Sequence, residues 1–133
     1  MDQKKYNNSS PRIKIIQKLY NSLMNPEALI EYPKSQYKKF IKDVVTGTLE
    51  RSELIEDQIN SYLKNDINLT KTDKLLKIIL FAAIFELMFK HNIPKKVIIN
   101  EYLLASEHFL EKIQIGYLNA ILDKISKELR KDG

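Results

Sequence analysis

Three polar residues stand among the apolar helical stripes in the second half of the chain. Asn100, Glu101 and Asn119 lie where helical spacing would otherwise place core residues. A buried amide or carboxylate destabilises a fold unless it is hydrogen bonded. We therefore expect these side chains to be structural polar residues that fix helix ends or bridge helices, or else to receive a partner.

Few residues have the types and spacing that catalysis or metal binding requires. His91 and His108 belong to no HExxH pattern, and cysteine is absent. The three glycines, at positions 47, 116 and 133, are isolated, so the chain has no glycine-rich phosphate loop. We predict that the chain is not an enzyme, that it has no catalytic residues, and that it uses neither a metal ion nor a cofactor.

Glu86 is a single carboxylate in an otherwise apolar segment. The run from Leu75 to Phe89 is interrupted only by Lys77 and Glu86. One interpretation is a surface residue paired with Lys90 one turn later. Because burial without a partner would be costly, the other interpretation places Glu86 at a groove where a protein or RNA partner docks.

Positive charge is concentrated near the N-terminus. The net charge of the 133 residues is +5, and residues 1–24 hold five basic residues against a single acid. These basic residues are Lys4, Lys5, Arg12, Lys14 and Lys18. The asymmetry predicts a polyanionic partner, either nucleic acid or an anionic membrane surface, although a solvated arm without a partner has the same composition. Residues 1–9 are predicted to be a flexible basic arm, followed by a helical domain over residues 10–133.

The apolar spacing predicts helices throughout the domain. Ser10 and Pro11 are typical of a helix start, and the first helix should run to about Met24. Its inward stripe is predicted to contain Ile13, Ile16, Tyr20 and Leu23. Its opposite, basic face is predicted to contain Lys14, Gln17, Lys18 and Asn21.

The remaining segments also favour an all-α fold. Residues 35–64 form either one helix or two helices separated near Gly47. The apolar run over residues 75–89 is shorter than the roughly 20 residues of a membrane span, so it predicts a central helix packed on several sides. Thr70 and Asp73 precede it with capping-box spacing. The chain is long enough to form a single compact domain without crosslinks.

Tyr20 and Tyr117 lie on helix faces with polar neighbours. Both could be residues at the edge of the core with their hydroxyls in water. Beside a basic helix they could instead be platforms on which unpaired RNA bases stack. The residues alone leave both interpretations open.

Five segments in their order and spacing resemble the NusB family of bacterial transcription antitermination factors. They are IIQKLY, FIKDVVTG, LFAAIFEL, IPKKVIINE and YLNAILDK. The resemblance extends from about Pro11 to Lys127 and is strongest from Leu80 to Lys124. It implies two small helical bundles packed across each other around the central helix.

The resemblance also implies a function. Family members bind the boxA segment of nascent ribosomal RNA leaders together with NusE, a small-subunit ribosomal protein. The complex then modifies RNA polymerase so that it passes termination signals. By this resemblance we expect a cytoplasmic protein whose partners are boxA-type single-stranded RNA, NusE and the RNA polymerase antitermination complex, without a membrane partner.

Site residues follow from the resemblance and from the charge pattern together. The expected RNA-binding residues are Lys4, Lys5, Arg12, Lys14, Gln17, Lys18, Tyr20 and Tyr117. The expected partner-binding residues are Phe81, Glu86 and Tyr117. The chain departs from the family at its start, where scattered lysines replace an arginine-rich segment, and at Phe81, where relatives often have arginine. Lysine attracts phosphate but lacks the planar fork of arginine, so bidentate contacts should be lost.

Other functions remain open. The chain could be a protein-interaction module, such as a homodimer that hides its RNA surface. It could also resemble the RNA-binding domain of ribosomal RNA methyltransferases, although we expect no catalytic domain because the chain ends soon after Lys127. Binding to a membrane surface would require a free apolar face on the first helix.

Overall fold

The computed structural model describes residues 10–131, and this part of the chain is helical with no strand. The helices are α1 (Pro11–Met24), α2 (Lys38–Glu50), α3 (Ser52–Leu63), the short 3-10 helix η2 (Leu69–Lys71), α4 (Lys74–Phe89), α5 (Lys95–Ser106) and α6 (Lys112–Leu129). The predicted all-α class is therefore confirmed. The predicted arm over residues 1–9, with Lys4 and Lys5, lies outside the described residues.

Helix α4 is the centre of the fold, as its apolar sequence predicted. Ten of its sixteen residues are buried, so side chains on every side of the helix pack against neighbours. It contacts each of the other five α-helices. Asp73 begins the helix, because its Oδ2 accepts hydrogen bonds from the backbone N–H groups of Leu75 (3.0 Å) and Leu76 (3.1 Å). Thr70, predicted to share a capping box, belongs to η2 instead.

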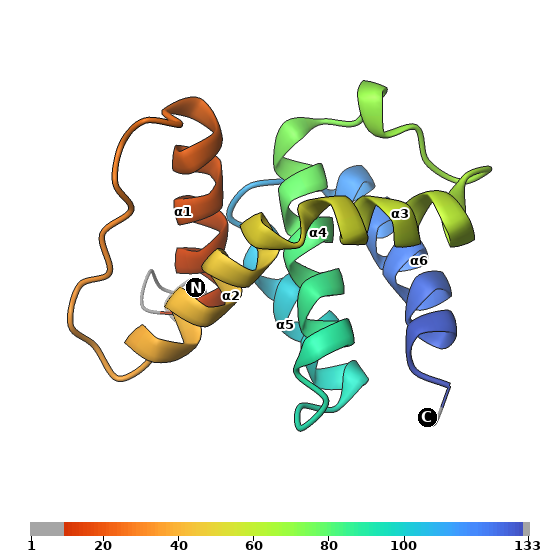
Figure 1. Ribbon diagram of the computed structural model, residues 1–133. Helices are drawn as coiled ribbons and strands as arrows, with labels where there is room; N and C mark the ends of the chain where they lie inside the picture. Colours follow the sequence, from red (N-terminus) through yellow and green to blue (C-terminus); the bar gives the residue numbers. More distant parts are fainter. Residues whose placement is uncertain (1–9, 132–133) are drawn as a thin grey trace.

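Two groups of helices pack on α4 from different sides. Helices α1 and α2 contact each other and α4, while α5 and α6 form a second group that also contacts α4. Helix α3 contacts both α4 and α6, and it continues from α2 across the central helix (Figure 1). This arrangement confirms the predicted pair of small bundles around a central apolar helix. Among residues 10–131, none of the helices has the length and apolar character needed to cross a membrane.

The buried stripe of α1 differs in part from the predicted one. Ile13 and Ile16 are buried as expected, but Ile15 and Leu19 complete the stripe, and Leu23 is 48% exposed. Leu23 lies in the last turn of α1, where it lines an open apolar hollow. The basic face of α1 is still directed away from the core.

Residues 35–64 form two helices, and the boundary is not at Gly47. Helix α2 ends and α3 begins at Arg51, which caps both. Gly47 lies inside α2, where a Cβ atom would come 2.2 Å from Cζ of the Phe85 ring. Glycine is required at this position because α2 crosses α4 in direct contact with that ring.

Substitution of this glycine provides a test of the crossing. Gly47→Ala should lower the free energy of unfolding by about 1–3 kcal/mol, because overpacking against Phe85 outweighs the gain in helix propensity. Gly116→Ala is the matched control, since a Cβ atom at this exposed position in α6 meets nothing within 4 Å. The control should raise stability by about 0.5–1 kcal/mol. Urea unfolding measures both, and a stabilised Gly47→Ala variant would contradict the proposed contact.

Candidate nucleic-acid interface

The outward face of α1 carries polar and basic side chains at helical spacing. Lys14, Gln17, Lys18 and Asn21 succeed one another at intervals of three, one and three residues, so they share one face. Gln17 and Asn21 are exposed, while the two lysines are half-buried. The predicted basic face of α1 is therefore present in the structure.

This face forms one side of a groove, called here the lysine groove. Its other side is built by the connection between α1 and α2 and by the start of α2. The groove has a volume of about 200 Å³, and its lining residues are Lys14, Gln17, Lys18, Asn21, Tyr32, Pro33, Lys34, Ser35, Lys38 and Ile41. Four of these residues are lysines and none is acidic, so the groove has a positive potential that suits an anionic ligand.

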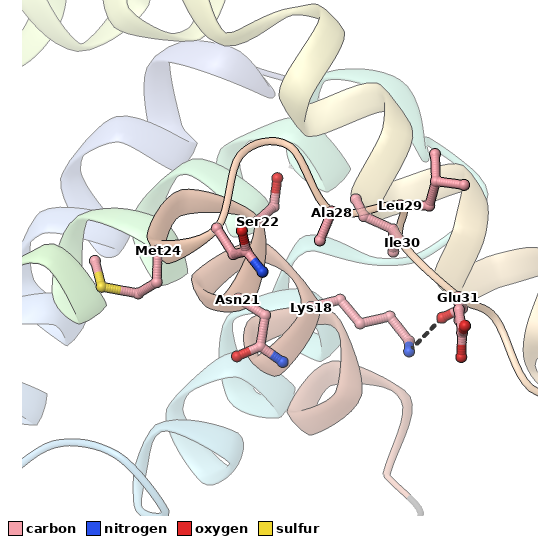
Figure 2. Close-up of a pocket in the computed structure, with 9 residues that line it drawn as sticks. Lys18, Asn21, Ser22, Met24, Ala28, Leu29, Ile30 and Glu31 are labelled. Carbon is pink, nitrogen blue, oxygen red and sulfur yellow. Dashed lines mark hydrogen bonds between the residues drawn. The ribbon is translucent and has the colours of Figure 1, made fainter.

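Lys18 holds the connection against α1. Its Nζ donates a hydrogen bond to the carbonyl oxygen of Glu31 at 2.6 Å and lies 5.4 Å from the centre of the Tyr32 ring. A second hollow of about 420 Å³ continues beside the groove, and Lys18 and Asn21 are among the residues that line it (Figure 2). The same two residues also line the lysine groove. The two hollows together follow α1 from Lys14 to Met24, which is about 15 Å of helix.

The two tyrosines predicted to hold bases lie at different places. Tyr20 is half-buried and lines a neighbouring hollow with Gln17, Asn21 and two apolar residues, Leu75 and Phe109. Tyr117 is 39% exposed, and its hydroxyl donates to the carbonyl oxygen of Asp66 at 2.8 Å. Partial burial and the nearby Asp66 raise the pKa of Tyr117. Only Tyr20 therefore adjoins the lysine groove through shared lining residues.

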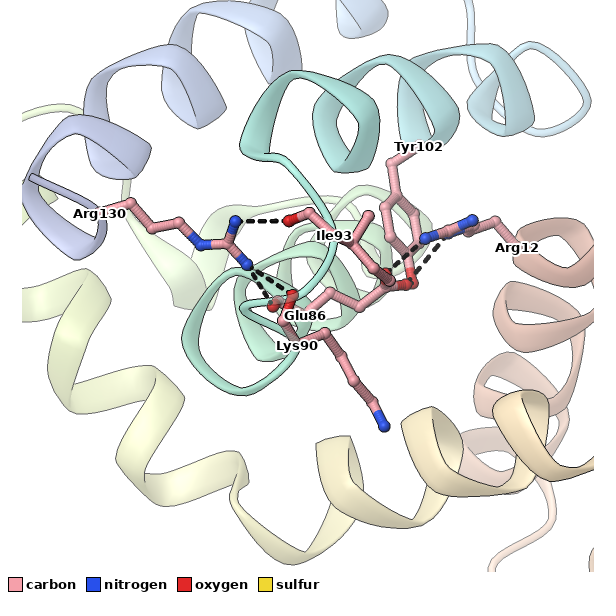
Figure 3. Close-up of polar contacts among 6 residues, drawn as sticks. All are labelled: Arg12, Glu86, Lys90, Ile93, Tyr102 and Arg130. Atoms are coloured by element: carbon pink, nitrogen blue, oxygen red, sulfur yellow. Dashed lines mark hydrogen bonds and ion pairs between the residues drawn. The ribbon is translucent and has the colours of Figure 1, made fainter. Parts of the chain in front are cut away.

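Arg12 and Glu86 do not occupy the surface positions predicted for them. The side chain of Glu86 is fully buried, and Arg12 is 8% exposed. The guanidinium of Arg12 donates to both carboxylate oxygens of Glu86, at 2.6 and 3.1 Å, and the Tyr102 hydroxyl donates a third bond (Figure 3). Lys90, the alternative partner of Glu86, instead pairs with Asp43. Arg12 and Glu86 thus pair with each other inside the core.

The surroundings of this ion pair favour its charged form. Burial alone lowers the pKa of Arg12, but the hydrogen bond and charge of Glu86 outweigh this effect and raise it. Burial, followed by the charge of Glu86, raises the pKa of Tyr102 well above its usual value, so its hydroxyl stays protonated. The Phe40 ring lies 4.9 Å from the Arg12 guanidinium and adds a cation–π contact.

A second buried arginine completes the end of α4. Arg130 is 7% exposed and donates to the carbonyl oxygens of Glu86, Lys90 and Ile93 (Figure 3). It also donates to the carbonyl oxygen of Leu87. The last carbonyls of a helix have no partner within it and carry partial negative charge. Arg130 therefore caps the C-terminal end of the central helix from α6.

The other predicted polar residues differ from expectation. Asn100 and Asn119 are exposed and Glu101 is half-buried, so none of the three is a buried core residue. The actual inward residues are their neighbours, Ile98 and Tyr102 in α5 and Leu118 in α6. Phe81 is 8% exposed and contributes to the apolar hollow that also contains Leu23. Within residues 10–131, no group of three acids or histidines is placed to hold a metal ion.

Comparison with known proteins agrees with this architecture. The model of the NusB family matches residues 3–127, which is nearly the whole chain. The chain belongs to the NusB family. NusB from Rickettsia bellii (strain OSU 85-389) is 38% identical over 97 residues, covering 73% of this chain and 60% of the relative. NusB from Rhodopseudomonas palustris (strain ATCC BAA-98 / CGA009) is 31% identical over 93 residues, covering 70% and 53%.

A solved structure shares the fold. T. maritima NusB superimposes with a TM-score of 0.78 over 92% of each chain, at 23% sequence identity. The aligned part of this chain spans only about half the length of the first curated relatives it matches. Membership of the NusB family and the shared fold are thus established, while RNA and protein partners are addressed as proposals below.

The lysine groove of this NusB-family chain contains residues that the sequence pattern did not indicate. Lys34 and Lys38 line it opposite α1, and the half-buried Tyr32 belongs to the same wall. In the sequence, Tyr32-Pro33 indicates only a loop or turn after the first helix. A cluster of lysines around residue 38 was the one available signal, because four lysines occur between residues 34 and 42.

Stability measurements test the buried pair. Arg12→Met or Glu86→Leu alone should lower the free energy of unfolding by about 3–5 kcal/mol, because each leaves an uncompensated buried charge. The double variant should recover most of this loss. Lys124→Met is the control, since the exposed Lys124–Asp66 pair at 2.8 Å should contribute less than about 1 kcal/mol. Single variants as stable as the unmodified chain, by urea unfolding, would rule out the pair as a core element.

Proposed function

We propose that this chain is a transcription antitermination factor that binds boxA-type single-stranded RNA of ribosomal RNA leaders together with NusE. The observation that carries the proposal is the lysine groove, which combines four lysines without an acid on the exposed side of α1. Membership of the NusB family agrees with it, because the curated relatives are named transcription antitermination proteins. The chain then acts by gathering ligands within the RNA polymerase complex rather than by catalysis, in the cytoplasm where transcription takes place.

The RNA contacts are assigned to the residues of α1 that face solvent. Lys14 and Lys18 attract phosphates, and Gln17 offers an amide to sugars or base edges. Tyr20, beside the groove, can stack on an unpaired base. Lys4 and Lys5 precede this face and keep their proposed role as phosphate contacts. Arg12 is not among the proposed RNA contacts, because its guanidinium donates hydrogen bonds to the buried carboxylate of Glu86.

The protein partner is assigned to a different surface. An apolar hollow of about 400 Å³ lies where the end of α1, the end of α2 and the start of α4 meet. Its apolar lining residues include Leu19, Leu23, Leu49, Ile78 and Phe81. Leu23 and Leu49 are each more than 40% exposed, and exposed apolar clusters are typical of protein interfaces. We assign Phe81 to the NusE contact on this basis, with Tyr117 kept as a further candidate and Glu86 removed.

Neutralising the two lysines of α1 tests the RNA assignment. Lys14→Gln with Lys18→Gln should weaken binding of boxA-type RNA roughly tenfold, and the slope of log affinity against log salt should become shallower by roughly 1.4. Lys64→Gln with Lys96→Gln is the control, because both lysines are exposed and lie just after α3 and in α5, outside the groove. Fluorescence anisotropy at several salt concentrations measures both slopes. Equal loss in the two double variants would remove the α1 face from the proposal.

The partnership with NusE has its own test. Purified chain, NusE and boxA-type RNA should co-elute as a ternary complex in size-exclusion chromatography, and the RNA should bind more tightly with NusE than without it. Leu23→Glu, at an exposed residue of the same hollow, should reduce complex formation with NusE while leaving RNA binding by the chain alone nearly unchanged. A mixture in which chain and NusE elute separately, with and without RNA, would contradict the proposed function. Elution of the chain as a homodimer that RNA does not alter would favour a protein-interaction module.

A further inference from the structure

The connection between α1 and α2 is long and is held in one place. Residues 25–37 contain no helix, and structureless loops of this length inside a compact domain are usually functional. The bond from Lys18 to the carbonyl of Glu31 fixes this connection, and the Tyr32 ring lies near the ammonium groups of Lys18 in α1 and Lys42 in α2. The connection therefore has a fixed position and forms one wall of the lysine groove.

Three cations of the groove have no internal counterpart. Within the described part of the chain, no acid or aromatic ring pairs with the ammonium groups of Lys14, Lys34 and Lys38. Lys34 and Lys38 are also exposed. Like charges gathered around one groove repel one another, and a bound polyanion would relieve that repulsion.

The start of α2 adds to this positive potential. Lys38 is the first residue of α2, where the helix dipole is positive and a cation is unfavourable for stability. The first turn contains no acidic residue, and the N-cap residue, Tyr37, makes no side-chain capping bond. The N–H of Lys38 donates to the carbonyl oxygen of Ser35 at 3.3 Å, and the remaining N–H groups of a helix start attract anions. A local arrangement that costs stability and has no internal compensation is typical of a functional site.

We infer that residues 32–38 form the second wall of an RNA track, in which Lys34 and Lys38 contact phosphates of a single strand opposite Lys14 and Lys18. This inference rests on the proposed RNA-binding function and extends it beyond α1. The strand lies along the groove, so that its phosphates are contacted from both walls. The connection after α1 is then part of the binding surface rather than a simple link.

Single-stranded RNA fits the groove better than an acidic peptide does. The walls also present Gln17, Asn21 and Ser35, which are neutral groups that can both donate and accept hydrogen bonds. Sugar hydroxyls and base edges use such groups, whereas a run of carboxylates offers only acceptors. The groove is also concave, and a flexible strand can follow it more readily than the rigid convex backbone of a duplex.

The test compares two pairs of lysines in the same assay. Lys34→Gln with Lys38→Gln should weaken binding of boxA-type RNA roughly tenfold and make the salt slope shallower by roughly 1.4, because two phosphate contacts are lost. The control double variant at Lys64 and Lys96 should keep the affinity and slope of the unmodified chain. Circular dichroism and the melting temperature should be unchanged in this variant and in the control, because the four lysines make no side-chain hydrogen bond, ion pair or ring contact within residues 10–131.

The possible outcomes separate the inference from the proposed function. If the variant at Lys34 and Lys38 binds RNA like the unmodified chain while that at Lys14 and Lys18 binds more weakly, the second wall is rejected and the proposed function stands. If the unmodified chain binds no boxA-type RNA with or without NusE, both are rejected. Displacement of the RNA by polyglutamate at equal charge concentration would identify the groove as a site for acidic peptides and would overturn the inference.

Discussion

The ion pair between Arg12 and Glu86 is the interaction on which the arrangement of the helices depends. It joins α1 to α4 inside the core, and the hydroxyl of Tyr102 adds α5 to the same carboxylate. A buried pair of this kind is weak evidence for net stability, because both charges lose their hydration. It is specific, however, since any shift of α1 along or around α4 would leave a charge unpaired. Fixing the rotation of α1 in this way directs Lys14, Gln17 and Lys18 outward.

Much of the fold could be predicted because its signals are local. The apolar run of α4 implied a helix surrounded by others, and the Ser10-Pro11 pair marked the start of α1 correctly. The ion pair could not be predicted, because its partners are 74 residues apart and nothing local relates them. Asn100 and Asn119 show the limit of periodicity, since an error of one residue in helical phase turns a side chain by about 100°. That rotation separates the buried Leu118 from the exposed Asn119.

Residues of the candidate site were likewise predictable only where a local sequence pattern placed them. Lys14, Gln17 and Lys18 were predictable, because a helix with one apolar face must present the remaining residues together. Lys34 and Lys38 were not, because the path of residues 25–37 is set by contacts such as that between Lys18 and Glu31 rather than by a repeating pattern. Family resemblance misplaced Arg12 and Glu86 for a related reason. The resemblance marked both positions as functional residues but did not indicate that the two side chains pair with each other.

The three arginines of the chain are all engaged within the fold, and this limits how the proposed RNA ligand could be recognised. Arg12 pairs with Glu86, Arg130 caps α4, and Arg51 lies 4.6 Å from the centre of the Phe89 ring. The groove is therefore cationic through lysines alone. Lysine is a compact, strongly hydrated charge without the planar fork that arginine offers to phosphates and guanines. Such a surface attracts a strand through its backbone and depends strongly on salt, but it distinguishes bases poorly. In the proposed RNA complex, sequence selection would then come from amide and aromatic side chains such as Gln17 and Tyr20, or from a partner bound beside them.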